Sequence, residues 1–200
     1  MDDIHSTRET LVQRLSNCYD EQSWEEFVKY YRGFIFAVVN RSGLSYEDSQ
    51  DVTQEVVLRA WKALPQFEYR KGECKFRSWL MTVCRHCMFD FAKSKRAKLE
   101  KLKVDVDSDV LTRCGSTEAE VDAIAEIEWK KHIAELALES INEDFSEIVL
   151  QTFHLHAEEL SVSEIATRLD ISENNVYVYR GRVRKALMKE IFRFEHQLNS

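Results

Sequence analysis

Two cysteines, Cys84 and Cys87, lie three residues apart, and thiols at this spacing can ligate zinc. A tetrahedral site needs two more ligands, and Cys74 and His132 can be named for them only as guesses. Cysteines at i and i+3 of a helix are more often small buried side chains than ligands. We therefore expect no metal and no cofactor. A zinc or enzymatic site at this cysteine pair is the alternative, which the zinc content of the purified protein would test.

Aromatic and basic residues alternate through the segment from residue 67 to residue 96. Single-stranded DNA offers unstacked bases, which aromatic rings capture at roughly 1–3 kcal/mol each, and basic groups attract phosphates. The pattern therefore predicts contact with melted or flipped bases. Because Trp79, Leu80 and Val83 read as a core face, we assign the contacts to the loop around Gly72 and to the basic side chains. The candidates are Tyr69, Arg70, Lys71, Gly72, Lys75, Arg77, Arg85, His86, Lys93 and Arg96.

A second basic region, residues 174–189, holds five basic residues and no acidic residue. On a helix, its face fits the major groove, where side chains near the helix N-terminus reach base edges and basic ones reach phosphates. Arg182 can read a guanine through its two donors. The candidate contacts with duplex DNA are Ser172, Asn174, Asn175, Tyr177, Val178, Gly181, Arg182, Arg184 and Lys185. A helical hairpin with a basic solvent face is the alternative.

Two short helices are expected to position this basic face. Ser161 and Glu164 have the S-x-x-E spacing of a capping box, so the first helix should begin there and stop near Asp170. Ser172 can then cap the second helix. Ala166 is small enough to lie where the helices cross. The apolar residues expected to anchor the second helix are Val176, Val183 and Leu187. The pattern predicts a helix-turn-helix.

An acidic and polar stripe lies on the helix expected over residues 46–67. The core stripe of this helix is Val52, Val56, Ala60, Ala63 and Leu64. The second stripe is Asp48, Asp51, Gln54, Glu55 and Leu58. An acidic face with a leucine set in it suits a basic helical partner, and a solvated helix face is the alternative.

Charge is distributed unevenly, although the net charge is −7. Residues 70–103 carry 11 basic and 3 acidic groups, a net of +8, and residues 104–128 carry 1 basic and 8 acidic groups, a net of −7. Because salt limits the reach of exposed charges to about 10 Å, such local islands decide whether phosphate is attracted. We predict an N-terminal domain over 1–100, an acidic flexible linker over 101–128 and a C-terminal domain over 129–200.

The composition predicts an all-α protein. One proline, five glycines and no alternating run of β-branched residues leave helices as the regular structure. No stretch reaches about 18 apolar residues and no cationic start precedes an apolar run, so we expect neither a membrane span nor a signal peptide. This predicts a cytoplasmic protein with reduced cysteines. No phosphate loop or catalytic-triad pattern is present in the sequence, so we do not expect an enzyme.

Three segments, in this order, resemble the extracytoplasmic-function group of the sigma-70 family. EDSQDVTQEVVLRAWKALPQF (47–67) is similar to the polymerase-binding helix of the family, and KFRSWLMTVCRHCMFDFAKSKR (75–96) to its −10 segment. Residues 142–187 are similar to its −35-binding domain. The resemblance covers about residues 20–96 and 130–190. It implies a sigma region 2-like helical bundle and a sigma region 4-like helix-turn-helix domain, joined by an acidic linker.

The resemblance implies an alternative sigma factor that directs core RNA polymerase to specific promoters and assists DNA melting. Its partners would be bacterial core RNA polymerase, promoter DNA as −35 duplex and melted −10 strand, and an anti-sigma factor. The stripe of Asp48, Asp51, Gln54, Glu55 and Leu58 would bind the polymerase. The loop after Phe67 would hold a flipped −10 base, and the helix from Ser172 would read the −35 element.

The chain departs from the family pattern at several positions. Ile141-Asn142 stands where the family usually has Leu-Pro, and Glu159 and Asp170 stand where glycines are common. His86 replaces a usual Asn. The departures in the recognition helix are Tyr177, Tyr179 and Arg180, the last expected to lie partly inward with its charge reaching solvent. The promoter sequence therefore cannot be transferred from relatives. A helix-turn-helix regulator that binds duplex DNA without core polymerase is the alternative function.

Overall fold

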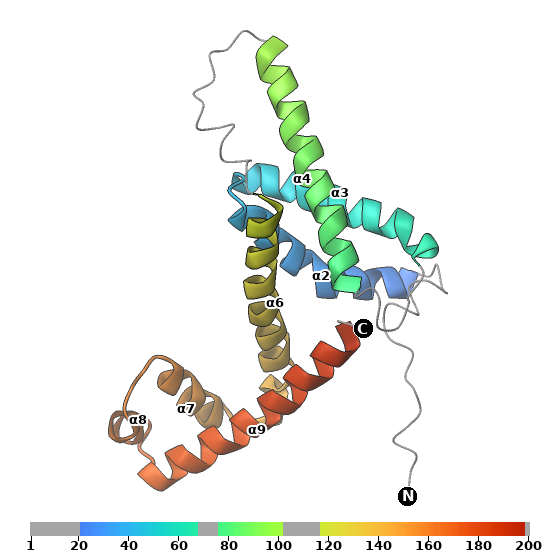
Figure 1. The fold of residues 1–200 in the computed structure, drawn as a ribbon. Coiled ribbons are helices and arrows are strands. Elements are labelled where there is room, and N and C mark those ends of the chain that lie inside the picture. The colour runs from blue at the N-terminus through green and yellow to red at the C-terminus, as the bar shows by residue number, and fades with distance from the viewer. Residues whose placement is uncertain (1–20, 68–75, 102–116, 199–200) are drawn as a thin grey trace, which may run out of the picture. The chain divides into compact units, whose positions relative to one another are not determined.

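The computed structural model describes residues 21–67, 76–101 and 117–198, and every regular element within these ranges is a helix (Figure 1). This confirms the predicted all-α fold class. No helix within these ranges combines the length and the apolar composition that a bilayer crossing needs.

The described residues group into two compact units. The first reaches His132 and includes Gln197 and Leu198, and the second is Ile133–His196. The division falls within α6 (Glu118–Ser140), which therefore contributes residues to both units.

The structure corrects the predicted acidic linker over its second half. Residues 102–116 lie outside the described part of the chain, but α6 begins at Glu118, inside the segment that was expected to be flexible. Val121, Ala125 and Trp129, spaced four residues apart, are each at most 5% exposed. This apolar stripe stabilises a helix, and the acidic residues between its members obscured it in the sequence. The first unit consequently extends past the expected end of the N-terminal domain.

Within the described residues of the first unit, three long helices precede α6. They are α2 (Glu21–Arg41), α3 (Tyr46–Ala63) and α4 (Phe76–Lys101), with the short 3-10 helix η1 (Leu64–Gln66) directly after α3. Ser45 caps α3, because its Oγ accepts a hydrogen bond from the backbone N–H of Asp48 at 3.2 Å. Pro65 lies in the first turn of η1, where its missing N–H sacrifices no helical hydrogen bond. α3 packs against both α2 and α4.

The core stripe predicted for α3 is confirmed at four of its five positions. Val52, Val56, Ala60 and Leu64 are buried, and Ala63 is half-buried. Burial of a valine or leucine side chain contributes roughly 1.5–3 kcal/mol relative to exposure, so this stripe fixes which face of α3 points outward.

The aromatic core of the first unit comes from α2, a helix that the sequence analysis did not predict. Phe27, Tyr31 and Phe34 are fully buried. The ring centroid of Tyr31 lies 5.2 Å from that of Phe76 and 6.4 Å from that of Trp129. α2 therefore contacts both α4 and the first part of α6. Burial raises the pKa of Tyr31, so its hydroxyl stays protonated.

The second unit consists of the end of α6, η2 (Asn142–Asp144), α7 (Glu147–Ala157), α8 (Val162–Leu169) and most of α9 (Glu173–Leu198). One buried cluster is Leu155, Ile165, Ala166 and Val176. A second is Ile141, Val149 and Val183. Because α9 supplies a residue to each cluster, two separate packing contacts hold its orientation on the shorter helices.

Candidate nucleic-acid interface

The capping box predicted at the start of α8 is present. The backbone N–H of Glu164 donates to Ser161 Oγ at 3.3 Å, and the backbone N–H of Ser161 donates to the Glu164 carboxylate at 2.8 Å. The Ser161 hydroxyl also donates to this carboxylate at 2.5 Å. These hydrogen bonds hold the pKa of Glu164 below its usual value. Residues 161–164 thus satisfy the backbone N–H groups of Ser161 and Glu164 among themselves. Because this interaction is local, the start of α8 could be predicted from the sequence.

The turn between α8 and α9 passes through a left-handed backbone conformation. Asp170 has φ 52° and ψ 49°, and the N–H of Ile171 then donates to the carbonyl of Ala166 at 3.0 Å. Ser172 caps α9, since its Oγ accepts from the backbone N–H of Asn175 at 3.2 Å. The predicted stop at Asp170 and the predicted cap at Ser172 are both confirmed. Asp tolerates this conformation better than most residues, but less easily than Gly.

The predicted anchors of α9 face inward. Val176 and Val183 are fully buried, and Leu187 is half-buried against the same cluster as Val183. The remaining face is open to solvent, with Tyr177 60% and Val178 46% exposed. The predicted duplex contacts that are exposed are Ser172, Asn174, Tyr177, Val178, Gly181, Arg182, Arg184 and Lys185, and Asn175 is half-buried. The structure therefore places eight of the nine predicted contacts at exposed positions on α9 or at Ser172 directly before it.

Arg180 and Arg182 of α9 contact different partners. Arg180 is half-buried and hydrogen-bonded to the ring of His156, in line with the inward placement expected for it. The Arg182 guanidinium lies 5.8 Å from the ring centre of Phe145, a cation–π distance. An exposed contact of this kind is weak, so Arg182 can leave the ring for a base edge.

The basic strip of the first unit is only partly within the described residues. Tyr69, Arg70, Lys71, Gly72 and Lys75 lie outside them. On α4, His86, Lys93 and Arg96 are exposed, whereas the Arg77 and Arg85 side chains are only 16% and 18% exposed. The predicted strip thus separates into an open set and a covered set.

The covered arginines are paired with acidic residues of α6, a relationship that the sequence analysis missed. Arg77 Nη2 lies 2.7 Å from Glu126 Oε2, and its guanidinium lies 5.4 Å from the ring centre of Trp129. Arg85 pairs with Asp122. A third pair joins Arg41 of α2 to Glu128 of α6. Two acids of the predicted linker, Asp122 and Glu126, therefore pair with arginines that were expected to bind DNA.

The aromatic rings near the start of α4 mostly pack on one another. The Phe67 centroid lies 5.6 Å from that of Phe76 and 4.9 Å from that of Trp79. Leu80 is buried, and Trp79 and Val83 are half-buried, which agrees with the inward face expected for these three. Rings used in this way stabilise the fold and leave base contacts to other groups.

The acidic stripe of α3 is largely exposed. Asp51, Gln54 and Leu58 face solvent, and Leu58 is 41% exposed. Asp48 pairs with Lys95 of α4. Burial raises the pKa of Asp48, but hydrogen bonds with Lys95 and Ser45 and the Lys95 charge outweigh it, so the net shift is downward.

A further stripe residue is held by a bridging arginine. Glu55 accepts from Arg59 Nε at 2.6 Å, and Arg59 Nη1 donates to Asp90 of α4 at 2.6 Å. These contacts orient one end of the stripe through α4 and leave its centre free for a partner.

The cysteine pair is buried in the first core. Cys84 and Cys87 are at most 2% exposed, and burial raises their pKa values to about 12 and about 11. Of the possible additional zinc ligands, Cys74 lies outside the described residues, and His132 Nε2 lies 2.6 Å from the backbone oxygen of Tyr30. Within the described ranges, no three His, Cys, Asp or Glu side chains form a cluster able to hold a metal. Neutral buried thiols suit packing rather than chemistry.

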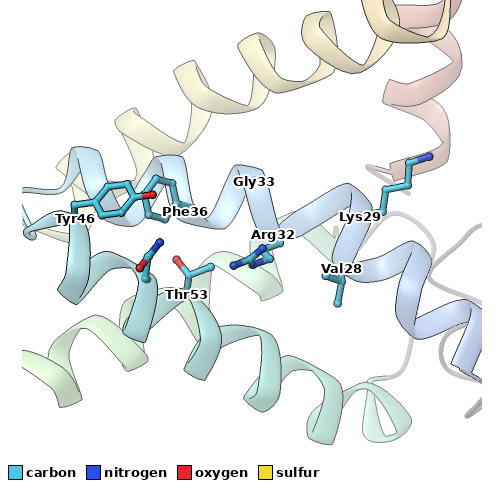
Figure 2. Close-up of a pocket in the computed structure, with 8 residues that line it drawn as sticks. Val28, Lys29, Arg32, Gly33, Phe36, Tyr46 and Thr53 are labelled. Atoms are coloured by element: carbon cyan, nitrogen blue, oxygen red, sulfur yellow. The ribbon is translucent and has the colours of Figure 1, made fainter.

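A groove of about 450 Å³ lies between α2 and α3 (Figure 2). Its lining residues are Val28, Lys29, Arg32, Gly33, Phe36, Tyr46, Gln50 and Thr53. The rings of Phe36 and Tyr46 meet edge to face at 5.4 Å at one end, and Lys29 lies at the other (Figure 2). This lining contains no carboxylate, imidazole or thiol, so it does not resemble an acid–base or nucleophilic centre.

Comparison with known proteins finds a family match in the first unit. Residues 27–98, from within α2 to near the end of α4, match the family described as Sigma-70 region 2. A solved structure, described as CnrH in complex with the cytosolic domain of CnrY, is 19% identical, with a TM-score of 0.36 over 90% of this chain and 93% of that chain. No curated protein matches the chain. Residues 27–98 are therefore similar to a sigma-70 region 2.

Proposed function

We propose that this chain is an alternative sigma factor of the extracytoplasmic-function group, which directs core RNA polymerase to specific promoters and assists DNA melting. The match of α2–α4 to sigma-70 region 2 carries the proposal. A helix-turn-helix with an exposed basic helix in the second unit supports it. The chain would have no active site of its own, because the polymerase supplies the chemistry.

Each surface has a role in this proposal. The stripe of Asp48, Asp51, Gln54, Glu55 and Leu58 would bind core polymerase, where an acidic face and one apolar side chain suit a basic helical partner. The exposed face of α9 would read the −35 duplex as a sigma region 4. An anti-sigma factor is a further partner that we expect from the family resemblance.

Melting would use the basic strip of α4. His86, Lys93 and Arg96 are exposed and can attract the phosphates of an opened strand, and the segment before α4 would hold a flipped −10 base. Capture of an unpaired base shifts the equilibrium toward open DNA, because only the open state offers that base. The energy for opening the duplex therefore comes from binding.

Reconstituted transcription tests the proposal. The purified chain is mixed with bacterial core RNA polymerase and a genomic promoter library, and run-off transcripts are sequenced. We expect transcripts that start at a common promoter class and a complex with core polymerase on a sizing column. Binding of duplex DNA with neither transcript nor complex would instead indicate a regulator that acts without polymerase. The Asp51→Lys/Leu58→Glu variant should lose the complex, and Ser163→Ala, on the surface of α8, should keep it.

A further inference from the structure

The contact between α4 and the first part of α6 pairs opposite charges along two helices. Arg77 meets Glu126 and Arg85 meets Asp122, so the order of the arginines is opposite to the order of the acids. The arginine side chains are 16% and 18% exposed, whereas Glu126 and Asp122 are 53% and 57% exposed. α6 therefore covers the arginines, and its own carboxylates remain at the solvent boundary.

An apolar contact holds α6 in this position. Trp129 is 1% exposed and lies with its ring centroid 5.0 Å from Phe34 and 6.4 Å from Tyr31. The buried Trp129 Nε1–H has no acceptor within the described residues. A buried donor without a partner costs free energy, so the contact is weaker than the burial of an indole alone would make it.

We propose that the first part of α6 is an autoinhibitory element, whose carboxylates occupy Arg77 and Arg85 in place of DNA phosphates. The inference rests on the proposed function, because it requires that these arginines bind DNA. Both contacts are charge pairs to the same guanidinium groups, so α6 and a DNA strand cannot hold them at once. Ion pairs with one well-exposed partner contribute little, and the dense charge of a DNA strand can displace them.

In this proposal, α6 limits unspecific binding of the chain to nucleic acid. With α6 in place, the open part of the strip offers His86, Lys93 and Arg96, but not the two covered arginines. Displacement of α6 would expose both arginines together, since a single helix covers them. Strand binding and release of α6 would then be coupled.

Neutralising the two carboxylates tests the proposal in the full chain. The probe is a fluorescent single-stranded thymidine oligonucleotide, titrated at several salt concentrations against wild type and Asp122→Asn/Glu126→Gln. The control is Glu118→Gln/Glu139→Gln, which removes the same charge from exposed residues of the same helix that form no ion pair within the described residues. We expect the test variant to bind about threefold to tenfold tighter than the control. Its plot of log affinity against log salt should steepen by about 0.7 for each freed phosphate contact.

Hydrogen–deuterium exchange gives a second, independent measurement. In the wild type, the oligonucleotide should increase exchange over residues 118–132, because the displaced helix loses its packing. The proposal is overturned if test variant and control bind with equal affinity and equal salt dependence. It is also overturned if exchange over residues 118–132 does not change, or if no version of the chain binds the oligonucleotide. Run-off transcription by the wild type separates this result from the proposed function. If transcripts form but test variant and control bind the oligonucleotide equally, the autoinhibition is overturned and the sigma-factor role stands. If no transcripts form, the sigma-factor role itself is overturned.

Discussion

The guanidinium of Arg77 lies 2.7 Å from the carboxylate of Glu126, and Arg77 also lies over the ring of Trp129 at 5.4 Å. One basic side chain of α4 is thus neutralised and covered by two residues of α6 that are three positions apart. The same α6 segment supplies a buried side chain to the core and a carboxylate to the surface. Fold stability and charge masking in the first unit therefore depend on one helix.

Trp129 should be a large contributor to the stability of the first unit. Trp129→Ala is expected to lower the free energy of unfolding by about 3–5 kcal/mol, because it leaves a cavity against Phe34 and Tyr31. Trp129→Phe should cost less, since it also removes the N–H that has no acceptor. Urea unfolding measures both. The matched control is Ile127→Ala, whose side chain is 59% exposed; a loss for Trp129→Ala as small as for this control would contradict the packing.

Glycine at the two positions with left-handed backbone conformation should stabilise the second unit. Glu159 has φ 68° and Asp170 has φ 52°. Glu159→Gly is expected to stabilise the unit by about 1 kcal/mol, and Asp170→Gly by less, because Asp tolerates this region better. Urea midpoints measure the change. Glu158→Gly, at φ −79°, is the control and should destabilise. A destabilising Glu159→Gly would show that the strain is absent.

Removing the cap of α8 should weaken the helix-turn-helix. Ser161→Ala is expected to cost about 1 kcal/mol, because the backbone N–H of Glu164 loses its acceptor. Ser163→Ala is the same change two residues later, where the hydroxyl has no capping role, and should have little effect. Thermal unfolding followed by circular dichroism compares them. Equal losses would mean that the capping box does not stabilise the domain.

The Asp48–Lys95 pair should give an acid-dependent contribution to stability. The pKa of Asp48 is lowered from 3.8 in the folded chain, so its carboxylate stabilises the fold fully above the unfolded value. This contribution is lost as the pH falls through the lower folded pKa. Asp48→Asn should therefore destabilise at neutral pH and match wild type in strong acid. Asp51→Asn, on the exposed part of the same helix, is the control. If Asp48→Asn remains less stable than wild type in strong acid, the Asp48–Lys95 pair is not the source of the difference.

Two arginines of α9 should separate base reading from phosphate binding. Arg182→Ala is expected to reduce discrimination between −35 duplexes that differ at a guanine by about 1–3 kcal/mol. Arg184→Ala should weaken all duplexes alike and reduce the salt slope by about 1. Fluorescence anisotropy with duplexes selected from the promoter library measures both. If both variants weaken every duplex equally, Arg182 binds phosphate and reads no base.

The helix-turn-helix could be predicted closely, and the first unit only in part. Capping at Ser161, the end near Asp170 and burial of Val176 and Val183 all follow from residues within a few positions of one another. By contrast, the aromatic core of α2 was missed, because its rings are buried by partners on α4 and α6 that lie far away in the sequence. The surface stripe of α3 was predicted as a set, but the pairing of Asp48 with Lys95 was not.

The sequence by itself determined the elements whose hydrogen bonds and apolar repeats are local. A cap forms within four residues, and a buried stripe recurs with the helical period, so both are legible in the chain. Only the tertiary structure decided that the acids of α6 face Arg77, Arg85 and Arg41. These groups belong to different helices, and their meeting depends on how Trp129 packs, which no local pattern encodes. The same carboxylates that indicated a linker in the sequence are, in the fold, partners of the basic strip.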